Sequence, residues 1–167
     1  PHAITDLKIE AGLDADGTGR LAVNFALQGD AERISLSCAG EETGFQLDSD
    51  GVWRAQLALR AIAPWWPRTH GEPKLYDARL SIDGRPYSLG LVGFRRIELD
   101  LGPDGRGFGL IVNGTPVFCR GAVWTNADIL RLPGAAEDYA PWLTLAAEAG
   151  MNMIRVGGTM TYESPDF

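Results

Sequence analysis

The chain has 167 residues, of which 45% are hydrophobic and 22% are charged, and its formal net charge at pH 7 is -7. The length suits one domain, or one domain plus part of another. The acidic balance argues against nucleic acid or an anionic membrane as the main partner. No apolar run reaches the length of about 18 residues that a membrane-spanning helix needs.

Cysteine and histidine are sparse and widely separated in this chain. Cys38 and Cys119 lie far apart, and neither is close in sequence to His2 or His70. Such spacing gives no metal-binding framework, and we expect neither a metal nor a cofactor. Each cysteine lies in an apolar, strand-like run, so we expect buried free thiols rather than a disulfide.

Residues 1–98 repeat a two-residue alternation of apolar and polar side chains, which is typical of half-buried antiparallel strands. The apolar members of the five clearest runs are Leu21, Val23, Phe25 and Leu27; Ile34, Leu36 and Cys38; Trp53, Ala55, Leu57 and Leu59; Tyr76, Ala78, Leu80 and Ile82; and Tyr87, Leu89 and Leu91. Asp83 and Gly84, between the last two runs, predict a tight hairpin turn. Seven or so strands without a helical pattern predict an immunoglobulin-like β-sandwich.

Residues 99–167 show a different order of signals. A glycine-rich turn at 102–107 precedes two expected strands, 108–112 and 116–122, which are separated by a turn at Asn113 and Gly114. An expected helix follows, and then residues 153–156 form a short apolar run that is typical of a strand buried on both faces. We therefore expect an incomplete strand–helix–strand segment of a larger parallel structure.

The expected helix has one apolar stripe, formed by residues at i, i+3, i+4 and i+7; these are Trp142, Leu145, Ala146 and Ala149. Asp138 is the expected N-cap. Pro141 is tolerable because it would lie in the first turn. Gly150 fits the left-handed position that ends a helix.

Three residues of the second part are candidates for a binding site. Arg155 lies in an apolar strand pattern, and a buried guanidinium needs a carboxylate partner. The alternative is a solvent-facing arginine on an edge strand. Trp124 and Asp128 follow the first strand, where loops at the C-terminal ends of parallel strands build sites. The alternative for Asp128 is a helix cap or a turn residue.

Tryptophan is also concentrated at Trp65 and Trp66, which precede Pro67. This pair suits either a sugar-stacking platform or a packing plug between domains. Large aromatic side chains usually bury, so we favour packing.

The motifs of the second part resemble glycoside hydrolase family 2, most closely its β-mannosidase branch. The matching residues are Asn113, Gly114, Pro116, Phe118, Gly121, Ala122, Trp124 and Asp128, and then Asn152, Met153, Arg155, Val156, Gly158, Tyr162 and Glu163. Upstream, 65–67 with 75–76, and 93–95, are similar to further family segments. The resemblance implies an immunoglobulin-like domain at 1–98 and the start of a (β/α)8 catalytic barrel at 99–167.

The resemblance implies a retaining exo-acting β-glycosidase that cleaves terminal β-linked sugars. Such chemistry needs two carboxyl groups about 5 Å apart. In the family both are glutamates on later barrel strands, so we expect this chain alone to be inactive. By the same resemblance Trp124 packs or stacks at the rim of the sugar site, Asp128 bonds a sugar hydroxyl, and Arg155 holds the nucleophile's carboxylate.

Some residues depart from the family pattern. Val123 stands where the family usually has asparagine, and Gly157 stands where it has tryptophan, a change that we expect to reshape the sugar subsite. An exo-β-glucosaminidase or β-galactosidase specificity is the alternative within the enzyme class. A non-catalytic immunoglobulin-like module that binds carbohydrate or protein is the alternative outside it. The open strands of a partial barrel also suggest self-association.

Overall fold

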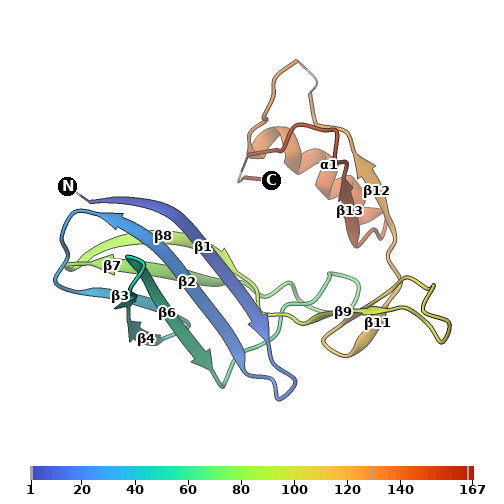
Figure 1. Ribbon diagram of the computed structural model, residues 1–167. Helices are drawn as coiled ribbons and strands as arrows, with labels where there is room; N and C mark the ends of the chain where they lie inside the picture. Colours follow the sequence, from blue (N-terminus) through green and yellow to red (C-terminus); the bar gives the residue numbers. More distant parts are fainter. Residues whose placement is uncertain (1, 129, 165) are drawn as a thin grey trace. The chain divides into compact units, whose positions relative to one another are not determined.

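The computed structural model describes residues 2–128, 130–164 and 166–167. The chain divides into two compact units (Figure 1). The first comprises Pro1–Trp66 and Gly71–Pro116, and the second comprises Pro67–His70 and Val117–Phe167. The domain boundary expected between residues 98 and 99 stays a prediction.

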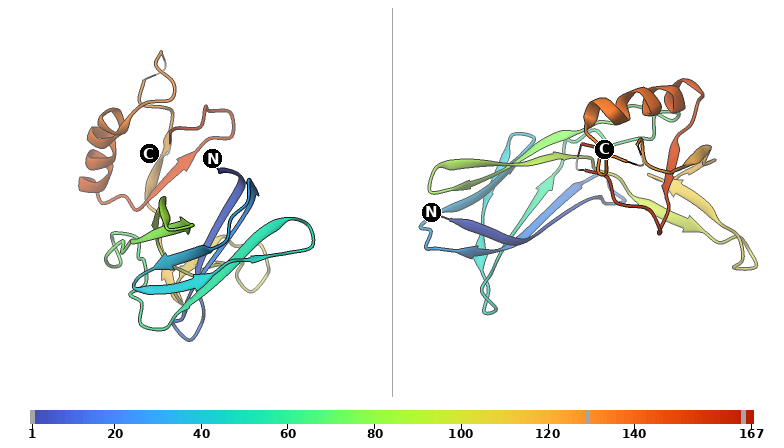
Figure 2. Two further views of the ribbon diagram at one scale, coloured as in Figure 1. Left: turned by 90° about the vertical axis from the view of Figure 1, so that its left-hand side faces the viewer. Right: turned by 90° about the horizontal axis from the view of Figure 1, so that it is seen from above.

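The first unit contains a β-sandwich of two antiparallel four-stranded sheets. One sheet has the order β1 (Ala3–Leu13), β2 (Gly19–Gln28), β6 (Val52–Leu59), β5 (Gln46–Leu47). The other has the order β4 (Glu41–Gly44), β3 (Ile34–Cys38), β7 (Tyr76–Ile82), β8 (Arg85–Val92). Figure 2 shows the two sheets as separate layers in its right-hand view. The predicted β-sandwich is confirmed.

The core lies between the two sheets and is built from the inward side chains of the alternating runs. Leu21, Val23 and Phe25 of β2 are fully buried, as are Leu36 of β3 and Leu80 of β7. The predicted alternation is therefore confirmed in these strands. Burial of apolar side chains is the main favourable contribution to folding, about 1.5–3 kcal/mol for each large residue.

The predicted turn at Asp83 and Gly84 is confirmed. Both residues have positive φ angles, 50° and 79°, which is the backbone of the hairpin turns that match strand twist. Asp83 also accepts hydrogen bonds from the backbone N–H groups of Glu32 and Arg33, at 2.9 and 2.8 Å. The turn thus fixes the β7–β8 register and is tied to the chain just before β3.

The expected inward position of Leu91 is wrong. Ala78 pairs with Gly90, but its neighbour Arg79 pairs with Ser88, so Leu89 is an extra residue in β8. A bulge of one residue exchanges the two faces of the strand beyond it. Leu91 is consequently 65% exposed and Val92 only 9% exposed. Gly90, with φ 87°, supplies the left-handed backbone that the bulge uses.

A three-stranded sheet continues the first unit, in the order β11 (Thr115–Val117), β10 (Gly109–Val112), β9 (Ile97–Asp100). The glycine-rich segment 102–107 joins β9 to β10, as predicted. Asn113 connects this sheet to the preceding chain. Its Oδ1 accepts a hydrogen bond from the Arg96 N–H at 2.9 Å, and its Nδ2 donates to the Trp65 carbonyl at 3.0 Å.

Trp65 has a packing role in the first unit. A Cβ added to Gly93 would lie 2.9 Å from Cδ1 of Trp65, so the Trp65 side chain packs directly against this glycine. The guanidinium of Arg95 lies over the ring at 4.7 Å from its centroid, within cation–π range. These contacts favour the packing interpretation over a sugar-stacking platform.

The second unit contains β12 (Gly121–Trp124), α1 (Ala136–Glu148) and β13 (Met153–Val156). β12 and β13 are parallel, and α1 connects them and lies alongside them (Figure 1). The predicted strand–helix–strand unit is therefore confirmed. The single strand expected over 116–122 is wrong, because β11 ends at Val117 and pairs with β10, whereas β12 begins at Gly121 and pairs with β13.

Helix α1 begins earlier than the sequence predicts. Ala135 is the N-cap, and Asp138 is the third helical residue, whose Oδ2 accepts the Ala135 N–H at 3.0 Å. Asp138 therefore caps the helix from inside rather than from the N-cap position, and Pro141 lies in the second turn rather than the first. The predicted end is confirmed: Gly150 has φ 74° and donates to the Ala147 carbonyl at 3.1 Å.

The expected burial of β13 on both faces is wrong. Within 153–156 only Ile154 is half-buried and the other three residues are exposed; in the part of the chain that the structure describes, β12 is the one strand paired with β13. The thiols of Cys38 and Cys119 are free, as predicted, although Cys38 is buried and Cys119 only half-buried. Among the described residues, no helix has the length and apolar character to cross a membrane.

The bulge in β8 predicts that substitutions at two adjacent residues change the stability of the first unit by very different amounts. We expect Val92→Asp to destabilise the first unit by about 3 kcal/mol, because it places an unpaired charge in the core. We expect Leu91→Asp to change stability by less than about 0.5 kcal/mol, since that side chain faces solvent. Urea denaturation followed by tryptophan fluorescence measures both, and equal losses would contradict the exchanged faces.

Candidate functional site

The candidate site lies where β12 ends and the chain turns toward α1. Trp124, the last residue of β12, is 9% exposed. Its Nε1–H donates to Oε1 of Glu163 at 2.7 Å. Its ring packs edge-on against Tyr139, with centroids 6.3 Å apart, and lies tilted against Phe167, with centroids 4.9 Å apart. The indole is thus enclosed, which favours packing over sugar stacking for Trp124.

The carboxylate of Glu163 accepts hydrogen bonds from four segments of the second unit. Besides Trp124, Oε1 accepts from Nδ2 of Asn126 at 2.8 Å. Oε2 accepts from the hydroxyl of Tyr139 at 2.9 Å and, at the long distance of 3.5 Å, from the Gly134 N–H. These donors favour the charged form and lower the pKa of Glu163, with Trp124 contributing most and burial opposing.

Asn126 has an unusual backbone. Its φ of 70° places a non-glycine residue in the left-handed region, which asparagine tolerates better than most residues. Its side chain holds this bend, because Nδ2 donates to Glu163 and also to the Thr161 carbonyl at 3.1 Å. The bend redirects the chain two residues before Asp128.

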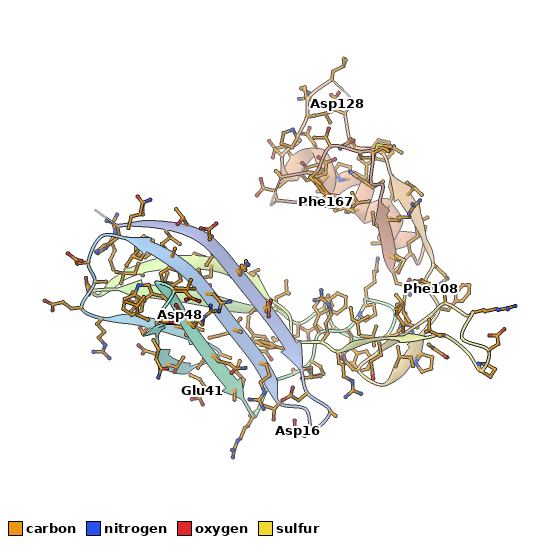
Figure 3. The ribbon with its side chains drawn as sticks, in the orientation of Figure 1. Asp16, Glu41, Asp48, Phe108, Asp128 and Phe167 are labelled. Atoms are coloured by element: carbon orange, nitrogen blue, oxygen red, sulfur yellow. The ribbon has the colours of Figure 1, made fainter. Side chains whose placement is uncertain are left out.

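Asp128 lies in the loop between β12 and α1 (Figure 3). Its Oδ1 accepts the N–H groups of Leu130 and Arg131 at 2.8 and 3.3 Å, and its Oδ2 accepts from Nε of Arg131 at 3.0 Å. These bonds, the one from Leu130 first, lower the pKa of Asp128. The geometry is that of a turn residue, the alternative that the sequence left open.

Arg131 joins Asp128 to the first turn of α1. Its guanidinium lies 3.0 Å from Oδ2 of Asp128 and 3.5 Å from Oδ1 of Asp138. The two acids therefore share one cation, and the pKa of Arg131 is raised, first by the hydrogen bond that it donates to Asp128. This arrangement does not resemble an acid/base pair, because one of the two carboxyl groups of such a pair must hold a proton.

The prediction that Arg155 is buried is wrong. Arg155 is exposed on β13, and no hydrogen bond or ion pair joins its side chain to the residues that the structure describes. Its register partner is Val123, which is also exposed. Since neighbours in a strand alternate between faces, Arg155 and Val123 lie on the face opposite Trp124 and Ile154. The desolvation argument for a carboxylate partner within this chain therefore does not apply.

An apolar groove of about 590 Å³ lies between α1 and β12. It is lined mainly by the predicted stripe of α1, by residues 122–127 and by Ile154. Trp142 and Leu145, which contribute to it, are both more than half exposed. The groove offers few polar groups, so it is poorly suited to bind a sugar, whose hydroxyls require donors and acceptors.

The structure thus separates the three predicted site residues. Trp124 and Asp128 lie at the two ends of one short segment, each in its own hydrogen-bonded cluster, whereas Arg155 lies on the face of the two strands opposite Trp124. The sequence analysis missed the roles of Asn126, Tyr139 and Glu163. Glu163 was visible only as a motif residue, and no spacing rule connects it to Trp124, which lies 39 residues earlier.

Removing one donor tests the charge state of Glu163. We expect Tyr139→Phe to raise the pKa of Glu163 toward 4.5, its ordinary value. A carboxyl whose folded-state pKa is lowered stabilises the fold above its unfolded pKa, and that stability is lost as pH falls through the folded pKa. Carbon-13 NMR titration of the Glu163 carboxyl measures the change. Tyr162→Phe, a substitution at an exposed neighbour, is the control.

The chain is similar in sequence and in structure to known glycosidases. The chain is 32% identical to β-mannosidase B of Aspergillus flavus and of Aspergillus oryzae, over 98% of this chain and 21% of each relative. A β-D-mannosidase structure from Dictyoglomus thermophilum is 27% identical, with a TM-score of 0.76, over 99% of this chain and 22% of that one. An exo-chitosanase of Amycolatopsis orientalis, 21% identical with a TM-score of 0.71 over 96% of this chain and 20% of that one, shows the same fold.

No family model matches the chain. The chain spans about one fifth of the length of the curated relatives that it matches. The predicted resemblance, which rests on motifs at 113–128 and 152–163, is confirmed by relatives aligned along nearly the whole chain. Along nearly its whole length the chain is thus similar to one segment of β-mannosidases, as the resemblance to glycoside hydrolase family 2 predicts.

Proposed function

We propose that the chain is part of a retaining exo-acting β-glycosidase, most similar to a β-mannosidase, that cleaves terminal β-linked sugars from oligosaccharides or glycoconjugates. The observation that carries the proposal is the 32% identity to β-mannosidase B along 98% of the chain. The parallel β12–α1–β13 unit supports it, because loops after parallel strands are where such barrels build their sites. Carbohydrate is then the substrate class of the whole protein.

Within that site we assign roles to three residues. Asp128 accepts a hydrogen bond from a sugar hydroxyl, which its remaining lone pairs allow, because Oδ2 accepts only one hydrogen bond from the described residues. Trp124 packs beneath the rim. Arg155 holds the carboxylate of the nucleophile, and its exposed guanidinium leaves it available for such a partner.

We further propose that this chain alone has no glycosidase activity. The chain spans about a fifth of its curated relatives, and hydrolysis with retention needs an acid/base and a nucleophile about 5 Å apart. In the second unit, the carboxylates that the described contacts bring together, Asp128 and Asp138, both lie against Arg131. The two catalytic glutamates would come from the remaining part of the catalytic barrel.

Two other functions remain as candidates. Exo-β-glucosaminidase or β-galactosidase specificity is one, supported only by the shared fold of the exo-chitosanase and by the glycine at Gly157. The other is a non-catalytic carbohydrate- or protein-binding module. The parallel strand–helix–strand unit disfavours that second candidate, because an immunoglobulin-like module does not need one.

The absence of activity is directly testable. We expect the purified 167-residue chain to release no nitrophenol from nitrophenyl β-mannoside above a heat-denatured control. The whole protein should hydrolyse it, and a panel of β-mannoside, β-glucosaminide and β-galactoside substrates identifies the preferred sugar. Turnover by the chain alone would overturn the assignment of the catalytic glutamates.

The role of Arg155 predicts a shift in a pH profile. In the whole protein, Arg155→Ala should raise the pKa of the nucleophile, because a nearby positive charge favours the ionised carboxylate. The acidic limb of the kcat/KM profile should therefore move to higher pH. Arg120→Ala, which removes an exposed arginine that precedes β12, is the matched control. An unmoved acidic limb would contradict the role.

A further inference from the structure

We propose that Glu163 is a positioning residue: through Trp124 and Asn126 it fixes the loop that carries Asp128. The inference rests on the proposed function only in giving Asp128 a role toward the sugar. The positioning itself is a property of the second unit and is measurable without any substrate.

Glu163 joins four segments of the second unit. Its donors come from the end of β12, from the loop that follows, from the segment before α1 and from α1 itself. A carboxylate only accepts hydrogen bonds, and bonds to an ionised acceptor are stronger than neutral ones. One side chain therefore holds segments that are otherwise separate in sequence.

The backbone conformation of Asn126 also depends on Glu163. A left-handed non-glycine residue persists only where its surroundings hold it. Two hydrogen bonds from Nδ2 do so here, to Glu163 and to the Thr161 carbonyl. Removing the carboxylate deletes one of these two bonds and the bond from Trp124 at once, so only the bond to the Thr161 carbonyl still holds the Asn126 side chain.

The loop that carries Asp128 is also fixed on the C-terminal side of that residue. Asp128 is held on its C-terminal side by its own turn and by Arg131, which also contacts Asp138 of α1. The direction in which its carboxylate faces is therefore set jointly by this turn and by the bend at Asn126. Positioning groups matter strongly for catalysis, since a displacement of about 1 Å can cost about 100-fold in rate.

Substitutions of Glu163 separate geometry from charge. Glu163→Gln keeps one carbonyl oxygen that accepts from Trp124 and Asn126, and its new amide N–H₂ donates to the Tyr139 oxygen, since a hydroxyl both donates and accepts. Only the long contact to the Gly134 N–H is then lost. Glu163→Ala removes every bond. A positioning role therefore predicts that Gln rescues what Ala loses.

The first experiment uses the 167-residue chain and nitrogen-15 NMR. We expect Glu163→Ala to shift the indole N–H of Trp124, the side-chain amide of Asn126 and the backbone amides of 125–128. Glu163→Gln should keep them near their original positions. Tyr162→Ala, at an exposed neighbour, is the matched control and should leave them unchanged. Unchanged loop resonances in Glu163→Ala would overturn the proposal, and the amide resonances of β12, α1 and β13 report whether the second unit remains folded.

The second experiment is a double-mutant cycle in the whole protein, with kcat/KM for the preferred β-glycoside as readout. We expect Glu163→Ala to lower kcat/KM by about 10- to 100-fold when Asp128 is present. In an Asp128→Ala background it should lower kcat/KM by less than about 3-fold, because the positioned group is gone. Equal losses in both backgrounds would overturn the positioning role.

The two experiments fail separately from the proposed function. A whole protein that is inactive on every β-glycoside refutes that function, and the NMR comparison then decides alone whether Glu163 positions the loop. Loss of activity in both Glu163→Ala and Glu163→Gln, with unchanged loop resonances in both, overturns the proposal and shows that the carboxylate acts on substrate directly.

Discussion

The parallel pairing of β12 with β13 is the constraint on which the second unit depends. Parallel strands cannot be joined by a tight turn, so the chain must cross over, and α1 is that crossover. The crossover brings the C-terminal ends of both strands to the same edge. Trp124 and Asn126 meet Glu163 there although 39 and 37 residues, respectively, separate them from it in sequence. The site is thus a consequence of strand direction.

Much of the fold was predictable because it depends on local patterns. Period-two alternation located β2, β3, β6 and β7, and the glycine signals located the turns at Asp83 and Asn113. The bulge in β8 was not predictable from the sequence. The extra residue leaves the two-residue spacing of Tyr87, Leu89 and Leu91 intact, but it moves Leu91 to the solvent face of the strand. The start of α1 was missed for a related reason, because Asp138 caps from inside the helix as well as it would from the N-cap.

The candidate site was less predictable than the fold. Trp124 and Asp128 were accessible through their place after a strand, but the burial of Arg155 was inferred from apolar neighbours alone. An apolar run indicates a covered strand only if further elements cover it, and β13 has one neighbouring strand. No local sequence pattern indicates the role of Glu163, because the residues that it contacts lie far away in sequence and are brought to it by the tertiary fold. Only the three-dimensional structure shows that donors from several segments bond to one carboxylate.

Gly121 has a consequence for how this strand can vary between relatives. A side chain at this position would collide with the carbonyl of Met153, the register partner of Gly121, so any larger residue must break the first step of the parallel pairing. Two residues later, Val123 is exposed on the opposite side of the strand from Trp124 and meets no such limit. Backbone contact therefore restricts Gly121 to glycine and places no such restriction on Val123. Valine at this position, where the resemblance leads us to expect asparagine, leaves the backbone pairing of β12 with β13 intact.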